Sequence, residues 1–269
     1  KSNPKARIII NFSDDYLNIL DLKRIGRVIK IKALDSSRIT FIVMDSLFKK
    51  FTNDEFTKNG IKNVNVVDFP FLLKNVHSPP NLNGKTSYKF SSLSRNYHPW
   101  RLELYLRLLK EDLLKEFNFS FHNLKPYDAN SSPPSIGKMK ADMASEKYPI
   151  TPISSQFLEN LPYDIGEPLE KWSDVTYDAI YKADFHLLIE SHFDCYLGGI
   201  WGYAKEDYNE EEFAPAFTTE KTYKAINCKR PFIAVSTPYF LRGVNEMGFK
   251  TFSPYIDESY DEIVDNKER

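Results

Sequence analysis

The sequence predicts an α/β protein with two domains, and three observations support this prediction. Apolar, β-branched runs of strand length recur along the chain and alternate with segments of helical spacing. The continuous apolar character of these runs is typical of parallel strands that helices cover on both faces of a sheet. A chain of 269 residues is long enough for more than one core, and its periodicity is interrupted once in the first third.

The N-terminal series contains three expected strands, at 6–12, 38–45 and 64–69. A helix is expected over 46–60, where the spacing is helical and a glycine stands at the end. The stretch "LKNVHSPPNLNGK" (73–85) then breaks all periodicity with two prolines, a glycine and three asparagines. We therefore predict an N-terminal domain over 1–82 and a second domain over 83–269.

The second series repeats the alternation. Strands are expected at 87–94, 117–123, 184–191, 231–236 and 249–255. Helices are expected at 98–117, where a proline stands near the first turn, at 174–183 and at 239–248. Residues 126–170 are rich in Pro, Ser and Lys and are expected to form long loops.

Composition limits the class of protein. Its 42% hydrophobic content is that of a folded chain, and no apolar run approaches the roughly 20 residues that cross a bilayer. Two cysteines without CxxC spacing predict no disulfide framework, which favours a cytoplasmic location. Residues 1–125 carry 22 Lys and Arg against 12 Asp and Glu, whereas residues 126–269 carry 14 against 25. This asymmetry indicates either an anionic partner for the first half or attraction between the halves, and two solvated surfaces are an equal alternative.

Several familiar catalytic motifs are absent. The sequence contains no GxGxxG, GxxxxGK[ST], GxSxG or HExxH, and its five histidines lack metal-ligand spacing. No Asp-x-Asp pair is present, which argues against enzymes that hold a divalent ion on a diphosphate with two such carboxylates. We therefore expect neither a metal site nor a cofactor.

The segment "FTTEKTYKAI" (217–226) is the strongest candidate for a binding site. It opens an expected helix ahead of the buried strand "PFIAV", so Thr218 or Thr219 can cap the helix and leave backbone N–H groups facing an anion. Lys221 adds a full positive charge there, and Glu220 can accept hydrogen bonds from sugar hydroxyls. Glu190, at the end of the strand "FHLLIE", is expected to project into the same crevice. The alternative is a favourable first turn with a solvated lysine.

The stretch from "LLIES" to "FTTEKTYKAINCKRPFIAV" resembles the donor-binding domain of GT-B glycosyltransferases, and is closest in style to the alpha-1,3-fucosyltransferase group and related phage and bacterial glycosyltransferases. In that group a strand ends in Glu, and an "[FY]-x-[ST]-E-K" segment opens a helix. The upstream "YKFSSLSRNYHPWRLELYLRLL" resembles the family's first donor-domain strand and helix. The resemblance implies two Rossmann-like domains, a GT-B-like fold, that face a central cleft.

The resemblance also implies a function and a set of residues. The chain would be a hexosyl- or pentosyltransferase that moves a sugar from a nucleotide sugar to a hydroxyl of a glycan without a metal. The family's diphosphate-contacting arginine matches Arg101 best, with Arg95 close behind. Its donor site would be completed by the residues already singled out, Glu190, Thr219, Glu220 and Lys221.

If the transfer inverts the configuration at the anomeric carbon, a base must remove the proton of the acceptor hydroxyl. This base would come from the N-terminal domain. Asp14 and Asp15 follow the first strand and are the candidates, although an Asp pair that caps the next helix is an equal reading. Glu103 and His77 are next in line. Two other functions stay open: transfer to a hydroxymethylated DNA base, as in phage DNA modification, which the basic N-terminal half favours, and a non-catalytic nucleotide- or carbohydrate-binding protein. The expected setting is the cytoplasm of a bacterium or of a phage-infected host cell.

Overall fold

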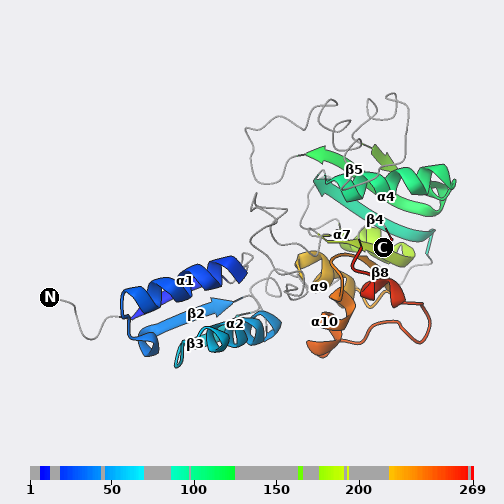
Figure 1. Ribbon diagram of the computed structural model, residues 1–269. Helices are drawn as coiled ribbons and strands as arrows, with labels where there is room; N and C mark the ends of the chain where they lie inside the picture. The colour runs from blue at the N-terminus through cyan, green and yellow to red at the C-terminus, as the bar shows by residue number, and fades with distance from the viewer. Residues whose placement is uncertain are drawn as a thin grey trace. The chain divides into compact units, whose positions relative to one another are not determined.

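A computed structural model describes residues 7–12, 19–43, 46–69, 86–96, 98–124, 163–165, 176–190, 193, 218–265 and 268–269. The chain divides into two compact units. The first comprises Lys1–His77, Asp194–Glu220 and Thr237–Thr251, and the second comprises Ser78–Phe193, Lys221–Ser236 and Phe252–Arg269. Each unit is described by itself, and Figure 1 labels most of their helices and strands.

The first unit holds a three-stranded parallel sheet in the order β1-β2-β3. Its elements are β1 (Ile8–Phe12), α1 (Ile19–Ile31), the 3₁₀ turn η1 (Ser36–Arg38), β2 (Ile39–Val43), α2 (Ser46–Lys58), β3 (Asn65–Asp68) and α10 (Phe240–Glu246). The three expected N-terminal strands and the helix that starts at residue 46 are therefore confirmed.

The core of this sheet lies on one face. Ile39, Phe41 and Val43 alternate inward along β2 and pack with α1 and α2 in a single apolar cluster. Two right-handed crossovers in the same direction place both helices on the same side of a sheet, which explains why α1 and α2 share this core. On the other face, Ile9 of β1 and Val67 of β3 are exposed. The sequence predicts helices on both faces of the sheet, but among the described residues α1 and α2 cover one face only.

The second unit holds a five-stranded sheet in the order β6-β5-β4-β7-β8. Its elements are β4 (Tyr88–Asn96), α4 (Pro99–Lys110), η2 (Leu114–Glu116), β5 (Phe117–Leu124), β6 (Tyr163–Ile165), α7 (Thr176–Tyr181), β7 (Ala183–Ile189), α9 (Glu220–Asn227), β8 (Phe232–Val235) and η4 (Ser259–Glu262). β4, β5, β7 and β8 are parallel, and only the short β6 runs antiparallel, at the edge beside β5. Sequence reasoning missed β6.

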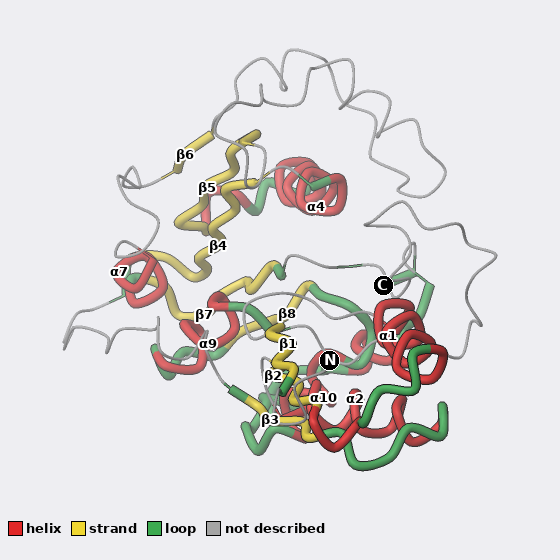
Figure 2. Tube along the Cα trace, turned by 90° about the vertical axis from the view of Figure 1, so that its left-hand side faces the viewer, coloured by secondary structure: helices red, strands yellow, loops and turns green. Residues whose placement is uncertain are grey.

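Helices cover both faces of this second sheet. α4 packs through Leu102, Tyr105 and Leu106 on the aromatic residues of β5, and the Tyr105 ring stacks on Phe119 with centroids 4.8 Å apart. α7 and α9 lie on the opposite side of the strands (Figure 2). This two-sided cover is the arrangement that the continuous apolar strands predict. The α/β class with parallel sheets, compatible with a Rossmann-like fold, is confirmed for both units.

Two expected elements differ from the structure. The expected strand at 249–255 does not form, and residues 253–255 make a turn in which the Phe252 carbonyl accepts from the N–H groups of Tyr255 and Ile256 at 2.7 and 2.9 Å. Pro254 lies between Phe252 and Tyr255 and lacks the backbone N–H that a strand would use for pairing. The helix expected over 98–117 ends at Lys110, since Asp112 adopts φ 55° and turns the chain into η2.

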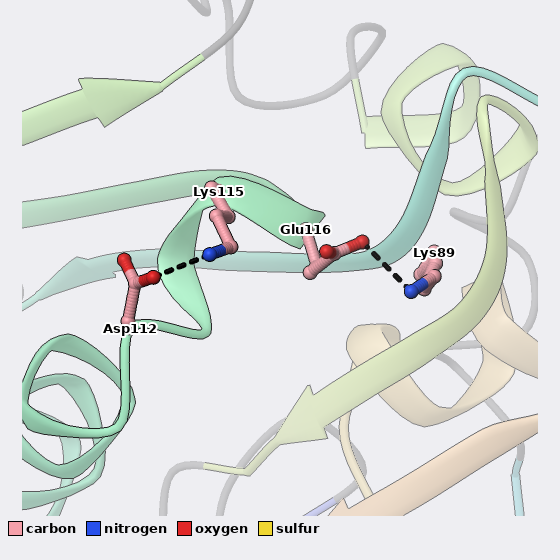
Figure 3. A network of polar contacts seen from close by, with 4 residues as sticks. All are labelled: Lys89, Asp112, Lys115 and Glu116. Atoms are coloured by element: carbon pink, nitrogen blue, oxygen red, sulfur yellow. Dashed lines mark hydrogen bonds and ion pairs between the residues drawn. The ribbon is translucent and has the colours of Figure 1, made fainter.

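The same helix ending recurs in both units. Ala33, Gly60 and Asp112 each follow a helix with positive φ, and the N–H of the next residue donates to the carbonyl five residues earlier, as in Leu34 to Ile29 at 3.0 Å. After α4, the Asp112 side chain also pairs with Lys115, which raises the pKa of that lysine. Figure 3 shows this pair beside the ion pair of Lys89 with Glu116, whose charged atoms are 3.1 Å apart.

No described helix is both long and apolar enough to pass through a bilayer.

Candidate functional site

The candidate site is the carboxyl edge of the second unit's sheet. The chain passes from β4 to β5 on one side and to β7 on the other, so the strand order reverses between β4 and β7. Open α/β sheets bind their ligands at such a switch point, outside the carboxyl ends of the strands. The polar side chains at the ends of β4, β7 and β8 therefore decide what this edge can bind.

Arg101 is fixed at this edge from the first turn of α4. Pro99 opens the helix, and the Arg101 and Leu102 N–H groups both bond to the His98 carbonyl at 3.1 Å. Arg101 is only 3% exposed, and its guanidinium Nη2 donates to the Glu190 carbonyl oxygen at 3.2 Å. The first helix of the unit is thereby tied to the end of β7, on the far side of the switch point.

Glu190 follows β7 directly and is completely buried. Its N–H donates to the Val235 carbonyl of β8 at 3.0 Å, which continues the ladder by one residue. The Thr222 hydroxyl of α9 donates to its Oε1, and Lys221 Nζ lies 3.9 Å from its Oε2. A buried carboxylate is tolerated only when it is paired and hydrogen-bonded, and these two residues supply both.

Helix α9 begins at Glu220, as the "FTTEKTYKAI" segment predicts. Thr219, just before it, is buried, whereas Glu220 is partly exposed. The Lys221 side chain is 28% exposed, and its Nζ lies 3.9 Å from Oε2 of the buried Glu190.

The structure therefore brings together three of the residues expected in the donor site, Arg101, Glu190 and Lys221. Glu190 is the centre of the group, since its backbone holds the guanidinium and its carboxylate holds α9. This geometry gives Glu190 a positioning function for the two cations. The contact of these residues with a donor stays a prediction.

Several other expected residues fall outside the part of the chain that the structure describes. Asp14, Asp15 and His77 are not among the described residues, and the same holds for the Arg95 side chain, although its backbone lies in β4 at a register shift against β5. Glu103 forms an i,i+4 ion pair with Arg107 on α4, which is an ordinary helix-surface pair.

Sequence reasoning missed Thr222 and the serines at the strand ends. Ser94 near the end of β4 and Ser236 just after β8 are buried, and their hydroxyls have no hydrogen-bond partner among the described residues. A threonine inside a helix or a serine inside a strand carries no local signal, because its importance depends on partners that are distant in sequence.

A second buried polar pair belongs to the interior of the sheet. Ser91 of β4 and His186 of β7 are register partners, and their Oγ and Nδ1 atoms are 2.9 Å apart. Burial lowers the pKa of His186 to about 4, so the ring is neutral at pH 7. This serine and histidine stabilise the sheet and do not resemble a nucleophile with an accessible base.

The described residues contain no group of three or more His, Cys, Asp or Glu side chains that could hold a metal ion. No family model, curated protein or solved structure matches the chain.

Proposed function

We propose that the chain is a metal-independent glycosyltransferase that binds a nucleotide sugar at the carboxyl edge of the second sheet and transfers the sugar to a hydroxyl of a glycan. The observation that supports this best is the convergence of Arg101 and Lys221 on Glu190 at the switch point. In this proposal the two units face each other across a cleft in a GT-B-like manner.

The cluster suits a diphosphate leaving group. Negative charge develops on the diphosphate as the glycosidic bond breaks, and fixed cations stabilise this charge without a metal. A guanidinium held by a carbonyl and an ammonium held by a carboxylate are preorganised, so little reorganisation is required when the charge forms. The N–H groups of the first turn of α9 would add donors to the same anion.

The acceptor side of the proposal rests on the first domain. A base there would remove the hydroxyl proton as the acceptor attacks the sugar, with Asp14 or Asp15 as the candidate. Donor binding and proton removal would then depend on different parts of the chain, which makes them separable by mutation.

A thermal-shift panel of UDP, GDP, CMP and their sugars tests the donor site. A nucleotide present at 100 times its dissociation constant adds about 2.7 kcal/mol to the free energy of unfolding. Stabilisation by one nucleotide series, together with turnover, is the expected result. Stabilisation without turnover would favour a non-catalytic binding protein, and the absence of any shift would contradict the proposal.

Lys221→Ala locates the binding. We expect it to weaken nucleotide-sugar binding by about 1.5–3 kcal/mol, the range for hydrogen bonds to charged groups. Lys110→Ala is the matched control, because Lys110 is exposed in the last turn of α4. Unchanged affinity in a folded Lys221→Ala protein would remove this lysine from the site.

A further inference from the structure

The outer surface of α1 in the first unit carries an unusual combination of side chains. Residues 23–32 contain five Lys and Arg and no Asp or Glu. Leu22, Gly26 and Ile29 form the buried stripe of the helix at i, i+4 and i+7 spacing. Two further stripes have the same spacing. One is shifted by one residue and consists of Lys23, Arg27 and Lys30, and the other is shifted by two residues and consists of Arg24, Val28 and Ile31.

The cations at the C-terminal end of α1 are presented to solvent. Arg27, Lys30 and Lys32 are exposed, and none of them has an ion-pair partner among the described residues. α2, which packs beside α1, differs in this respect: its Lys49 pairs with Asp68 at 2.9 Å and its Lys50 with Glu246 at 3.6 Å. Arg27, Lys30 and Lys32 therefore differ from Lys49 and Lys50 of α2, each of which is paired with a carboxylate.

Large apolar side chains stand between these cations. Ile31 is 70% exposed and Val28 is 52% exposed, and Leu34 continues the apolar surface just beyond the helix. Exposed isoleucine and valine beside exposed arginine and lysine give this surface of α1 an apolar and a cationic component, and contact with an anionic membrane surface uses both.

We propose that this face, made of Arg27, Val28, Lys30, Ile31 and Lys32, docks the protein on an anionic lipid surface. The cations would bind lipid phosphates, while Ile31 and Val28 would enter the boundary between headgroups and acyl chains. A nucleic acid would use the cations alone, because its interfaces are more polar and offer no apolar layer to the exposed isoleucine. The combination therefore favours a lipid surface, and this inference does not depend on the proposed transferase activity.

Vesicle co-sedimentation of the full chain tests the proposal. Vesicles of phosphatidylcholine with phosphatidylglycerol are compared with vesicles of phosphatidylcholine alone, and binding to the anionic vesicles only is expected. Each cation near an anionic surface contributes about fivefold to partitioning. The double variant Arg27→Glu/Lys30→Glu should therefore bind the anionic vesicles roughly 25-fold or more weakly.

Two matched controls test whether binding depends on this face or only on the overall charge and hydrophobicity of the protein. Lys58→Glu/Lys62→Glu makes the same change in charge at exposed positions of α2 and the loop after it, and should bind nearly as well as the wild type. Ile31→Ser should weaken binding, whereas Leu113→Ser, which removes an exposed leucine from the second unit, should not.

Three results would overturn the proposal. The first is equal binding to both vesicle types, and the second is equal loss in the two charge-reversal variants. The third is a wild-type protein that does not bind anionic vesicles but binds duplex DNA tightly, with the DNA binding abolished in Arg27→Glu/Lys30→Glu. That result would assign the face to nucleic acid. A melting curve for each variant shows that it is folded.

Discussion

At the scale of single residues, Glu190 illustrates how a buried charge can organise a site. Its carboxylate is withdrawn from water, and its stability depends on the Thr222 hydroxyl and the Lys221 ammonium. The same residue accepts Arg101 through its backbone oxygen. Loss of any one partner should therefore affect both folding and the placement of the cations.

Thr222→Val removes the hydroxyl donor and keeps the shape of the side chain. We expect the free energy of unfolding to fall by about 1–3 kcal/mol, because a buried acceptor oxygen loses its hydrogen bond. Urea unfolding measures this loss. Thr57→Val, at an exposed position of α2, is the control and should change little. Equal stability of the two variants would show that the Thr222 hydroxyl contributes nothing to the fold.

His186 makes a prediction about pH. Its folded pKa of about 4 lies below the unfolded value of 6.5, so the unfolded chain takes up a proton at a higher pH than the folded chain does. The stabilising contribution is complete above pH 6.5 and is lost as the pH falls toward 4. At pH 5 the protein should have lost about 2 kcal/mol of stability through this residue alone, relative to its stability at neutral to alkaline pH.

His186→Leu isolates that contribution. Both proteins lose stability in acid through their carboxylates, but the decline of the leucine variant between pH 7 and pH 5 should be shallower. The comparison uses the difference between the two declines in urea unfolding and not the absolute stabilities, since the substitution also removes the contact with Ser91. If both proteins lost the same amount of stability between pH 7 and pH 5, a group other than His186 would be responsible for the loss.

At the scale of elements, the ends of the helices are the feature that the two units share. The position after α1, α2 and α4 must adopt positive φ, which glycine does without a steric penalty. α2 has Gly60 there, at φ 66°, but α1 has Ala33 at φ 47°. Alanine can therefore be replaced by glycine after α1, and glycine by alanine after α2, at equivalent positions.

Ala33→Gly should stabilise the protein by about 0.5–1 kcal/mol, since relief of the left-handed strain exceeds the entropy that glycine adds to the unfolded chain. Gly60→Ala should destabilise it by a similar amount. No heavy atom outside its immediate neighbours lies within 4 Å of a Cβ placed at Gly60, so the cost would come from φ alone. Thermal or urea unfolding of both variants measures the two effects. Changes of the same sign would contradict this account of the helix ends.

At the scale of the whole molecule, local patterns predicted much of the architecture. The strands of both units apart from β6, and the start of α9 at Glu220, follow from apolar runs, turn residues and a capping sequence. The error at 249–255 arose because apolar alternation favours a strand, whereas Pro254 and the carbonyl of Phe252 make a turn. The contact of Thr222 with Glu190 could not be predicted, because it spans 32 residues and depends on the register of β7 and β8.

The proposed division of labour between the two domains can be tested with the carboxylates after β1. If Asp14 or Asp15 removes the acceptor proton, its Asn variant should bind the nucleotide sugar normally and transfer the sugar about 10²–10⁴-fold more slowly. Normal binding is expected because Arg101 and Lys221, the cations proposed to bind the donor, lie in the second unit. Turnover at saturating donor is the measurement, with a melting curve for each variant.

The matched comparison is with Lys221→Ala, which should have the opposite signature. That variant should lose donor affinity, and its turnover should recover in part at high donor concentration, whereas a missing base cannot be compensated by more donor. If both Asn variants keep more than about a tenth of wild-type turnover, the base lies elsewhere, with Glu103 or His77 next in line. Glu103 is the weaker of these two, because the i,i+4 ion pair with Arg107 already engages its carboxylate on the surface of α4.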